Sequence, residues 1–166
     1  MNSIGNQFLK EFRRWNVTFS KSELQCEKPY KLYIHSRNRT NPGFTSSASV
    51  LYNNNGELVD TESRYNGIVS VDVSQYESIL SGLELCKKKN IKNVIINTES
   101  HLLVKQMGGI WKVKGSELRM LNSKCNTVLT KFNDWNIRHI NKEENSMARD
   151  LTEKVLKSLE DKYKTQ

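Results

Sequence analysis

Two different periods of apolar and polar residues follow one another along this chain. Residues 31–35 and 44–52 are short runs rich in apolar and β-branched side chains, and each predicts a strand. Residues 57–65 alternate apolar and polar side chains and predict a third strand. The run 53–56, Asn-Asn-Asn-Gly, tolerates positive φ, so we expect a hairpin turn there. Three antiparallel strands therefore open the folded part of the chain.

After the third strand, helical spacing alternates with strand patterns. Apolar side chains share one helical face over 76–86 and predict a helix. The continuous apolar run 94–98 is typical of a central strand that is buried on both faces. Ser100 is the expected N-cap of a short helix over 101–107, which the following Gly-Gly pair ends.

The last third of the chain adds two helices and a strand. Apolar spacing predicts a helix over 118–132 with Ser116 as its N-cap, a short strand over 135–140, and a final helix over 148–159. The full order is three strands, helix, strand, two helices, strand and helix. Such an order predicts one mixed sheet with helices on both faces.

The first 28 residues are predicted to lead into a separate folded domain at 29–166. Ile4, Phe8, Phe12 and Trp15 recur at helical spacing, so residues 4–15 predict an amphipathic helix. Residues 20–28 predict a linker. We expect the helix to dock on the domain or on a protein partner.

Length and composition limit the class of protein. A chain of 166 residues with 36% hydrophobic residues, 8 glycines and 2 prolines suits one globular domain and excludes a collagen-like chain. No apolar run approaches the roughly 18 residues of a membrane span, and the start lacks the apolar core of a secretory signal. The scattered Cys26, Cys86 and Cys125 predict a reducing intracellular compartment and no zinc cluster.

The chain is strongly basic. It has 26 lysines and arginines against 18 aspartates and glutamates, a net charge of +8. A positive excess favours polyanionic partners such as nucleic acid. The alternative explanation is that the charge only keeps the protein soluble.

Four blocks of the sequence resemble the ribonuclease H family, and the resemblance covers residues 30–160. In chain order they are similar to the family patterns D-G-x-x-x-x-N-P-G, E-x-x-A-L-x-x-G-L, D-S-x-L-V-V-x-Q with G-x-W-K-x-K, and E-x-N-x-x-A-D-x-L; they lie at residues 35–43, 75–83, 99–114 and 143–151. The resemblance implies the ribonuclease H-like fold: a five-stranded mixed sheet, three antiparallel strands and then two parallel ones, with helices on both faces.

The chain departs from the family at the metal site. Family enzymes hold two Mg²⁺ ions with four carboxylates, and the resemblance places these positions at His35, Gln75, Glu99 and Arg149. Only Glu99 is a carboxylate, and the four side chains sum to zero charge with His35 neutral. Because Mg²⁺ requires oxygen ligands, this set predicts a pseudoenzyme with no catalytic residues, bound metal or cofactor. We expect Arg149 to form an ion pair with Glu99 in place of the metals.

Two other metal sites remain open from the sequence. One is an active metal-dependent ribonuclease H with a remodelled site, in which Glu99 and either Asp72 or Asp150 hold Mg²⁺. The other is a single softer ion, such as Zn²⁺, bound by His35 and Glu99.

Binding surfaces of the family are better preserved than its metal site. The resemblance implies nucleic-acid contacts from three segments, with candidate residues Arg37, Arg39, Asn41, Trp111, Lys112, Lys114, His139 and Lys142. A structural alternative is that the Pro42-Gly43 pair only makes the turn and Trp111 only packs.

The sequence therefore predicts an inactive binding or scaffold module in a nucleic-acid-associated complex. Its partner is a protein, RNA, DNA, an RNA–DNA hybrid or a combination of these, and no membrane is involved. Similar inactive domains occur as connection or tether domains of retroelement reverse transcriptases. Whether this chain is a retroelement relic or a domesticated host subunit stays open.

Overall fold

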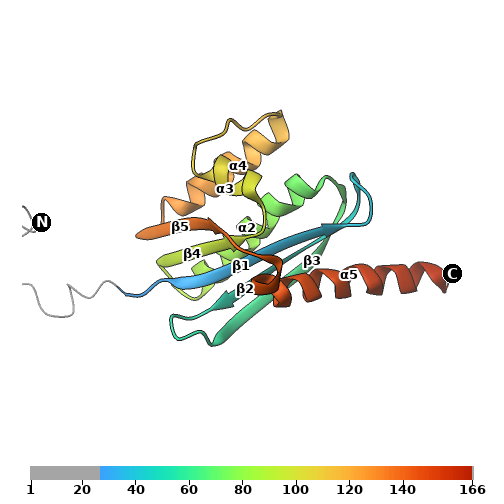
Figure 1. Ribbon diagram of the computed structural model, residues 1–166, viewed down its shortest axis with the longest axis horizontal. Coiled ribbons are helices and arrows are strands. Elements are labelled where there is room, and N and C mark those ends of the chain that lie inside the picture. The colour runs from blue at the N-terminus through green and yellow to red at the C-terminus, as the bar shows by residue number, and fades with distance from the viewer. Residues whose placement is uncertain (1–26, 166) are drawn as a thin grey trace, which may run out of the picture.

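The central sheet of the computed structural model has the strand order β3-β2-β1-β4-β5 (Figure 1). The structure describes residues 27–165, so the helix predicted over 4–15 lies outside the described residues. The element order within this range is the predicted one. Its strands and helices are β1 (Tyr30–Asn38), β2 (Gly43–Tyr52), β3 (Leu58–Val69), α2 (Val71–Lys88), β4 (Asn93–Thr98), α3 (His101–Met107), α4 (Ser116–Leu129), β5 (Asp134–His139), the 3-10 turn η1 (Lys142–Asn145) and α5 (Ser146–Lys164).

Strand directions confirm the predicted mixed sheet. β1 pairs antiparallel with β2, and β2 pairs antiparallel with β3. On the other side β1 pairs parallel with β4, and β4 pairs parallel with β5. β1 is therefore the central strand, and the carboxyl end of β4 lies beside the middle of β1, where Tyr33 is opposite Asn97. Polar side chains from the two strands meet just beyond this point.

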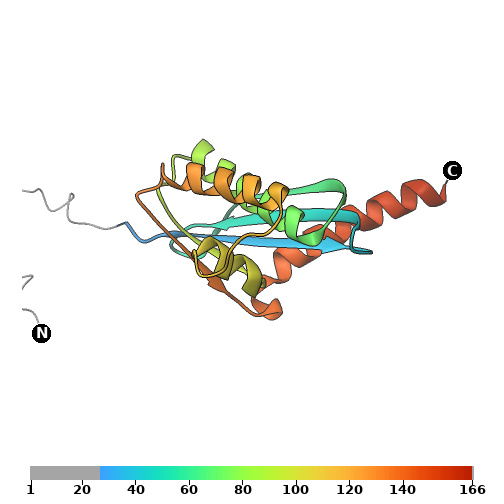
Figure 2. The same ribbon diagram turned by 90° about the horizontal axis from the view of Figure 1, so that it is seen from above.

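Helices cover both faces of the sheet. α2 packs on β1 and β2 with α4 against it, while α5 packs across β1, β2 and β3 from the opposite face (Figure 2). α5 also continues beyond the sheet to the C-terminal end (Figure 1). None of the helices within residues 27–165 combines the length and apolarity that a membrane crossing requires.

Two apolar clusters form the core, one on each face of the sheet. The larger lies between the sheet and α2 and includes the fully buried Leu32, Ile79 and Leu83. The smaller lies beneath α5 and is built around Ala48, Val50 and Ala148. α2 approaches β1 closely through Gly82, since a Cβ there would lie 2.6 Å from Leu32 Cδ2.

Polar residues explain where the observed elements differ from the predicted ones. β1 extends to Asn38 because its last residues stay paired with β2, as far as Asn38 opposite Thr45. Within this polar end the buried Ser36 Oγ donates to Ser74 Oγ of α2 at 2.9 Å. Ser116 was expected to cap its helix, but it is the first helical residue, and Gly115, at φ 87°, is the N-cap. The cap predicted at Ser100 is confirmed, because its side chain accepts a hydrogen bond from Leu103 N.

Candidate functional site

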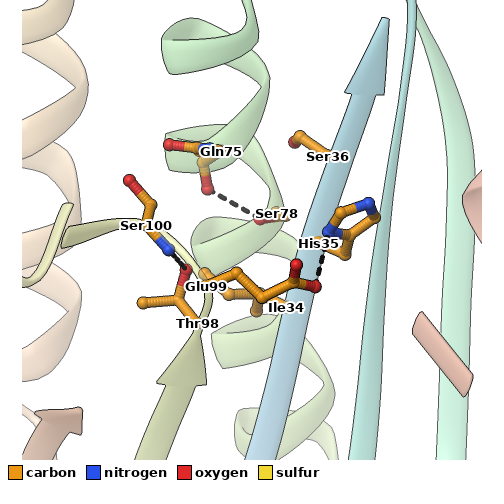
Figure 3. Close-up of a pocket in the computed structure, with 8 residues that line it drawn as sticks. All are labelled: Ile34, His35, Ser36, Gln75, Ser78, Thr98, Glu99 and Ser100. Atoms are coloured by element: carbon orange, nitrogen blue, oxygen red, sulfur yellow. Dashed lines mark hydrogen bonds and ion pairs between the residues drawn. The ribbon is translucent and has the colours of Figure 1, made fainter. Parts of the chain in front are cut away.

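The four positions that correspond to the family's metal ligands converge in the structure. His35 on β1, Gln75 on α2 and Glu99 just after β4 line one pocket of about 220 Å³. Figure 3 shows the Glu99 carboxylate directed toward the His35 ring. Arg149 reaches the same carboxylate from α5. The parallel pairing of β1 with β4 sets this geometry, because it sets Asn97 opposite Tyr33, so that Glu99 follows β4 at the level of His35.

Glu99 is the centre of this cluster. Its Oε2 accepts a hydrogen bond from Arg149 Nη1 at 2.7 Å, which is the ion pair predicted from the sequence. Its Oε1 accepts from Asn145 Nδ2 at 2.9 Å and lies 3.2 Å from His35 Nδ1. The side chains of Glu99 and Arg149 are 22% and 33% exposed, so the pair is partly desolvated. Both carboxylate oxygens are therefore already engaged by protein nitrogen atoms.

Asn145 is a member of the cluster to which the sequence assigned no role. It is buried at the end of η1, and its Nδ2 also donates to the backbone carbonyl of Ile34 at 3.0 Å. One amide group thus connects β1, Glu99 and the start of α5. The signal in the sequence was the asparagine of the fourth family block, which we matched without giving it a function.

His35 is neutral at pH 7. Burial lowers the pKa of His35 to about 4, and the nearby Arg149 and Arg37 act in the same direction, while the Glu99 carboxylate opposes the shift. The cluster therefore holds one negative charge on Glu99 and one positive charge on Arg149. This matches the zero charge counted from the sequence.

This set of side chains does not fit a pair of Mg²⁺ ions. Mg²⁺ is held by oxygen ligands in near-octahedral geometry, and here the single carboxylate already accepts N–H donors. Nor does it form a ready site for a softer ion, because His35 and Glu99 have no third histidine, cysteine or carboxylate beside them. Across residues 27–165 no three such side chains gather closely enough to hold a metal ion.

The carboxylates proposed as substitutes lie elsewhere. Asp72 lines a separate groove beside Trp111. Asp150 is exposed on α5 and is not among the residues that line the Glu99 pocket. Glu77 accepts a hydrogen bond from Asn66 Nδ2 in a third hollow on α2. The backbone therefore does not bring a second carboxylate to Glu99.

The first predicted binding segment is tied to α5. Arg37 Nε lies 2.9 Å from Glu153 Oε2, and Arg39 contacts both Glu153 and Glu160. These carboxylates neutralise the two arginines. Asn41 is also engaged, since its Oδ1 accepts from Val71 N at 3.3 Å, at the start of α2.

The second predicted segment presents an open basic surface. Trp111, Lys112 and Lys114 line a groove of about 560 Å³ together with Leu102 and Asp72. Trp111 is 51% exposed, so about half of its side chain is available for contact with a ligand. Within the described chain the two lysines make no ion pair, and their charges face solvent.

The third predicted segment lies between β5 and α5. The ring of His139 stacks on that of His101, with centroids 3.7 Å apart. Lys142 is exposed, and its Nζ lies 4.0 Å from Glu143 Oε1. The three segments thus differ in availability: the arginines of the first are paired with carboxylates, whereas among residues 27–165 the lysines of the groove at Trp111 are not.

Known proteins share the sequence pattern and the fold of this chain. Residues 36–155 match the family described as reverse transcriptase-like. Ribonuclease HI of Halobacterium salinarum (strain ATCC 700922 / JCM 11081 / NRC-1) is 26% identical over 124 residues, or 75% of this chain. Bifunctional protein Rv2228c of Mycobacterium tuberculosis (strain ATCC 25618 / H37Rv) is 27% identical over 111 residues, or 66% of this chain. The aligned parts span only 62% and 30% of those two relatives.

Solved structures agree with the family match. RNase H1 from the halophilic archaeon Halobacterium salinarum NRC-1 superposes with a TM-score of 0.76 at 25% identity, covering 78% of this chain and 98% of that one. LC11-RNase H1 in complex with an RNA/DNA hybrid superposes with a TM-score of 0.74 at 26% identity, covering 78% and 99%. The sheet order, the position of the pocket and these matches show that the chain belongs to the reverse transcriptase-like family, as a ribonuclease H-type domain.

Proposed function

We propose that this domain is a catalytically inactive ribonuclease H-like module that binds nucleic acid within a larger complex. The observation that carries the proposal is the Arg149 guanidinium, 2.7 Å from Glu99 Oε2, at the point where family enzymes gather metal ions. The module's role is then to hold a duplex or a partner, without cleaving either.

Electrostatics supports the loss of metal binding. A dication about 4 Å from a unit charge, at an effective dielectric constant of about 20, interacts by about 8 kcal/mol. Glu99 would attract the ion by this amount and Arg149 would repel it by a similar amount. Because the two contributions cancel, nothing offsets the dehydration that Mg²⁺ resists.

The groove around Trp111 supports nucleic-acid binding. Exposed Lys112 and Lys114 suit backbone phosphates, and the exposed indole of Trp111 suits a sugar or base face. The net charge of +8 strengthens attraction at long range. Such a surface recognises the shape of a duplex, and the hybrid-bound relative makes an RNA–DNA hybrid the first ligand to test.

A paired binding and cleavage assay tests the proposal. Labelled RNA–DNA hybrid, duplex RNA and duplex DNA are each mixed with the protein at about 50 and 200 mM salt, with Mg²⁺ or Mn²⁺ present. We expect salt-sensitive binding and no cleavage. Cleavage that Glu99→Gln abolishes would overturn the inactive assignment. Absence of binding to all three duplexes would overturn the nucleic-acid role and leave a protein partner, for which residues 4–15 stay the predicted contact.

Restoring the carboxylates provides the matched gain-of-function test. The variant His35→Asp/Gln75→Glu/Glu99→Asp/Arg149→Asp converts all four positions to the family pattern. We expect Mg²⁺ to raise the melting temperature of this variant and to leave that of the unchanged chain the same, because only the variant has four carboxylates that can bind the ions. A Mg²⁺-dependent rise in the unchanged chain would contradict the proposed loss of the metal site.

A further inference from the structure

β3 is a border strand of the sheet within residues 27–165. It runs for 12 residues, Leu58–Val69, and its neighbour in the described sheet is β2 alone (Figure 1). Its outer backbone edge therefore has no strand against it in this part of the chain. Such an edge is a template for a further strand, and proteins usually guard it with charges or irregular backbone.

The middle of β3 is regular enough to accept a partner strand. Register irregularities occur where β2 passes from Thr45 to Ser46 and from Leu51 to Tyr52. Between them, residues 60–65 pair residue by residue with β2. The irregular backbone is thus confined to the ends of β3.

The charged residues of this stretch are complementary between two antiparallel copies of β3. Glu62 and Arg64 form an ion pair within the strand, and their side chains lie on the same face. An antiparallel second copy of β3 with Ser63 opposite Ser63 sets Glu62 against Arg64 of the second copy, and Arg64 against its Glu62. A shift of two residues opposes two arginines in one direction and two glutamates in the other, and like charges directly opposite each other are unfavourable. The second shift also sets Arg64 opposite Asp60, but that carboxylate is already paired with Lys89 of its own chain.

The same register also matches the apolar residues at the two ends. Leu58 and Ile68 are 51% and 66% exposed, and this register sets each of them against the other in the second copy. Thr61 comes opposite Tyr65, which is 40% exposed. Charge, apolar and aromatic–β-branched pairs therefore favour one and the same alignment.

We propose that two copies of this chain associate through β3 in this register, with a two-fold axis at Ser63, to form one continuous sheet. The inference is independent of the proposed nucleic-acid role, because the β3 edge and the Trp111 groove share no residues. A single strand edge buries little area compared with a permanent dimer. The dimer is therefore expected to dissociate at a concentration of about 10–100 μM.

Charge reversal tests the register. Sedimentation equilibrium of the full chain over about 1–500 μM measures the dimer dissociation constant. Glu62→Arg and Arg64→Glu should each weaken the dimer by about tenfold, because like charges then face each other twice. The double variant Glu62→Arg/Arg64→Glu should recover the affinity, and an equimolar mixture of the two single variants should form a heterodimer. A monomer at all concentrations, or a dimer indifferent to these charges, would overturn the proposal.

Disulfide trapping provides a second measurement that does not depend on affinity. In a Cys26→Ser background, Ser63→Cys places two thiols on the axis, within the Cα separation that a disulfide spans. Thr61→Cys is the matched control, since its copies would lie about 13 Å apart along the strands. The remaining Cys86 and Cys125 are buried, and burial raises the pKa of each thiol to about 12, so they stay unreactive. Mild oxidation should link Ser63→Cys and not Thr61→Cys; equal or absent linking would overturn the proposed register.

Discussion

Replacing Arg149 by methionine removes the positive charge from the Glu99 cluster and keeps most of the apolar stem. The resulting decrease in the free energy of unfolding lies between two limits, because an exposed ion pair contributes about 0–1 kcal/mol and breaking a buried one costs about 3–5 kcal/mol. Arg149 and Glu99 are 33% and 22% exposed, and Glu99 keeps its hydrogen bond from Asn145. We therefore expect the free energy of unfolding to fall by about 2 kcal/mol at pH 8. In a domain of this size that corresponds to a melting temperature lower by about 4–8 °C.

The same variant should be less harmful in acid. Arg149 is one of the charges that hold the pKa of His35 down at about 4, so its removal lets that pKa rise toward the ordinary 6.5. A protonated His35 can then replace the missing cation beside Glu99. At pH 5 the loss of stability caused by Arg149→Met should thus be smaller than at pH 8 by about 1 kcal/mol.

Urea denaturation at pH 8 and pH 5, followed by circular dichroism, measures both effects. Lys157→Met is the control, since Lys157 is 67% exposed and its Nζ lies 3.8 Å from Glu153 Oε1. It should cost less than about 0.5 kcal/mol at either pH. An Arg149→Met variant as stable as this control at pH 8, or a loss that does not depend on pH, would refute the reasoning about the cluster.

Three further predictions concern other parts of the molecule. The unchanged chain should lose up to about 3 kcal/mol of stability as the pH falls from 6.5 to 4, because His35 takes up a proton in the unfolded chain but not in the folded one. In urea titrations His35→Gln should make the free energy of unfolding less dependent on pH over this range. Gly82→Ala should lower the urea midpoint, since overpacking against Leu32 costs about 1–3 kcal/mol and outweighs the helix propensity gained; an unchanged midpoint would contradict the close approach. In a filter-binding assay Arg39→Ala should change the affinity for the hybrid by less than about twofold, because Arg39 is neutralised by α5 carboxylates. Lys112→Ala should weaken this affinity severalfold. The opposite order would place the binding surface at the first predicted binding segment.

Much of the fold could be predicted because local patterns agree with it. A strong apolar run such as 94–96 favours a strand buried on both faces, and turn residues such as Gly56, at φ 84°, favour the hairpin. The boundaries were less predictable where polar residues extend an element. The end of β1 is paired with β2 and its buried Ser36 is satisfied by Ser74, 38 residues away, and no local pattern encodes such contacts.

The candidate site was predictable in its members and less so in its contacts. The ion pair of Arg149 with Glu99 followed from the family resemblance, which places both residues at one site, together with charge balance, and the structure confirms it. The pairing of Arg39 with Glu160 did not follow, because the two residues lie 121 positions apart and only the path of α5 brings them together. For the same reason the sequence could not show that, among the described residues, Arg37 and Arg39 are neutralised by carboxylates while Lys112 and Lys114 are not.

The contact between Arg149 and Glu99 also constrains how this lineage can change. Replacing Arg149 alone by aspartate would set two carboxylates side by side, and only protonation of His35 could then supply a positive charge between them. This variant would be less stable than either the present chain or a Mg²⁺-bound chain with all four carboxylates, because its like charges repel each other and no metal ion compensates them. Introducing the four carboxylates one at a time would therefore pass through an intermediate that folds less stably, so only their joint introduction is expected to give a well-folded metal-binding variant.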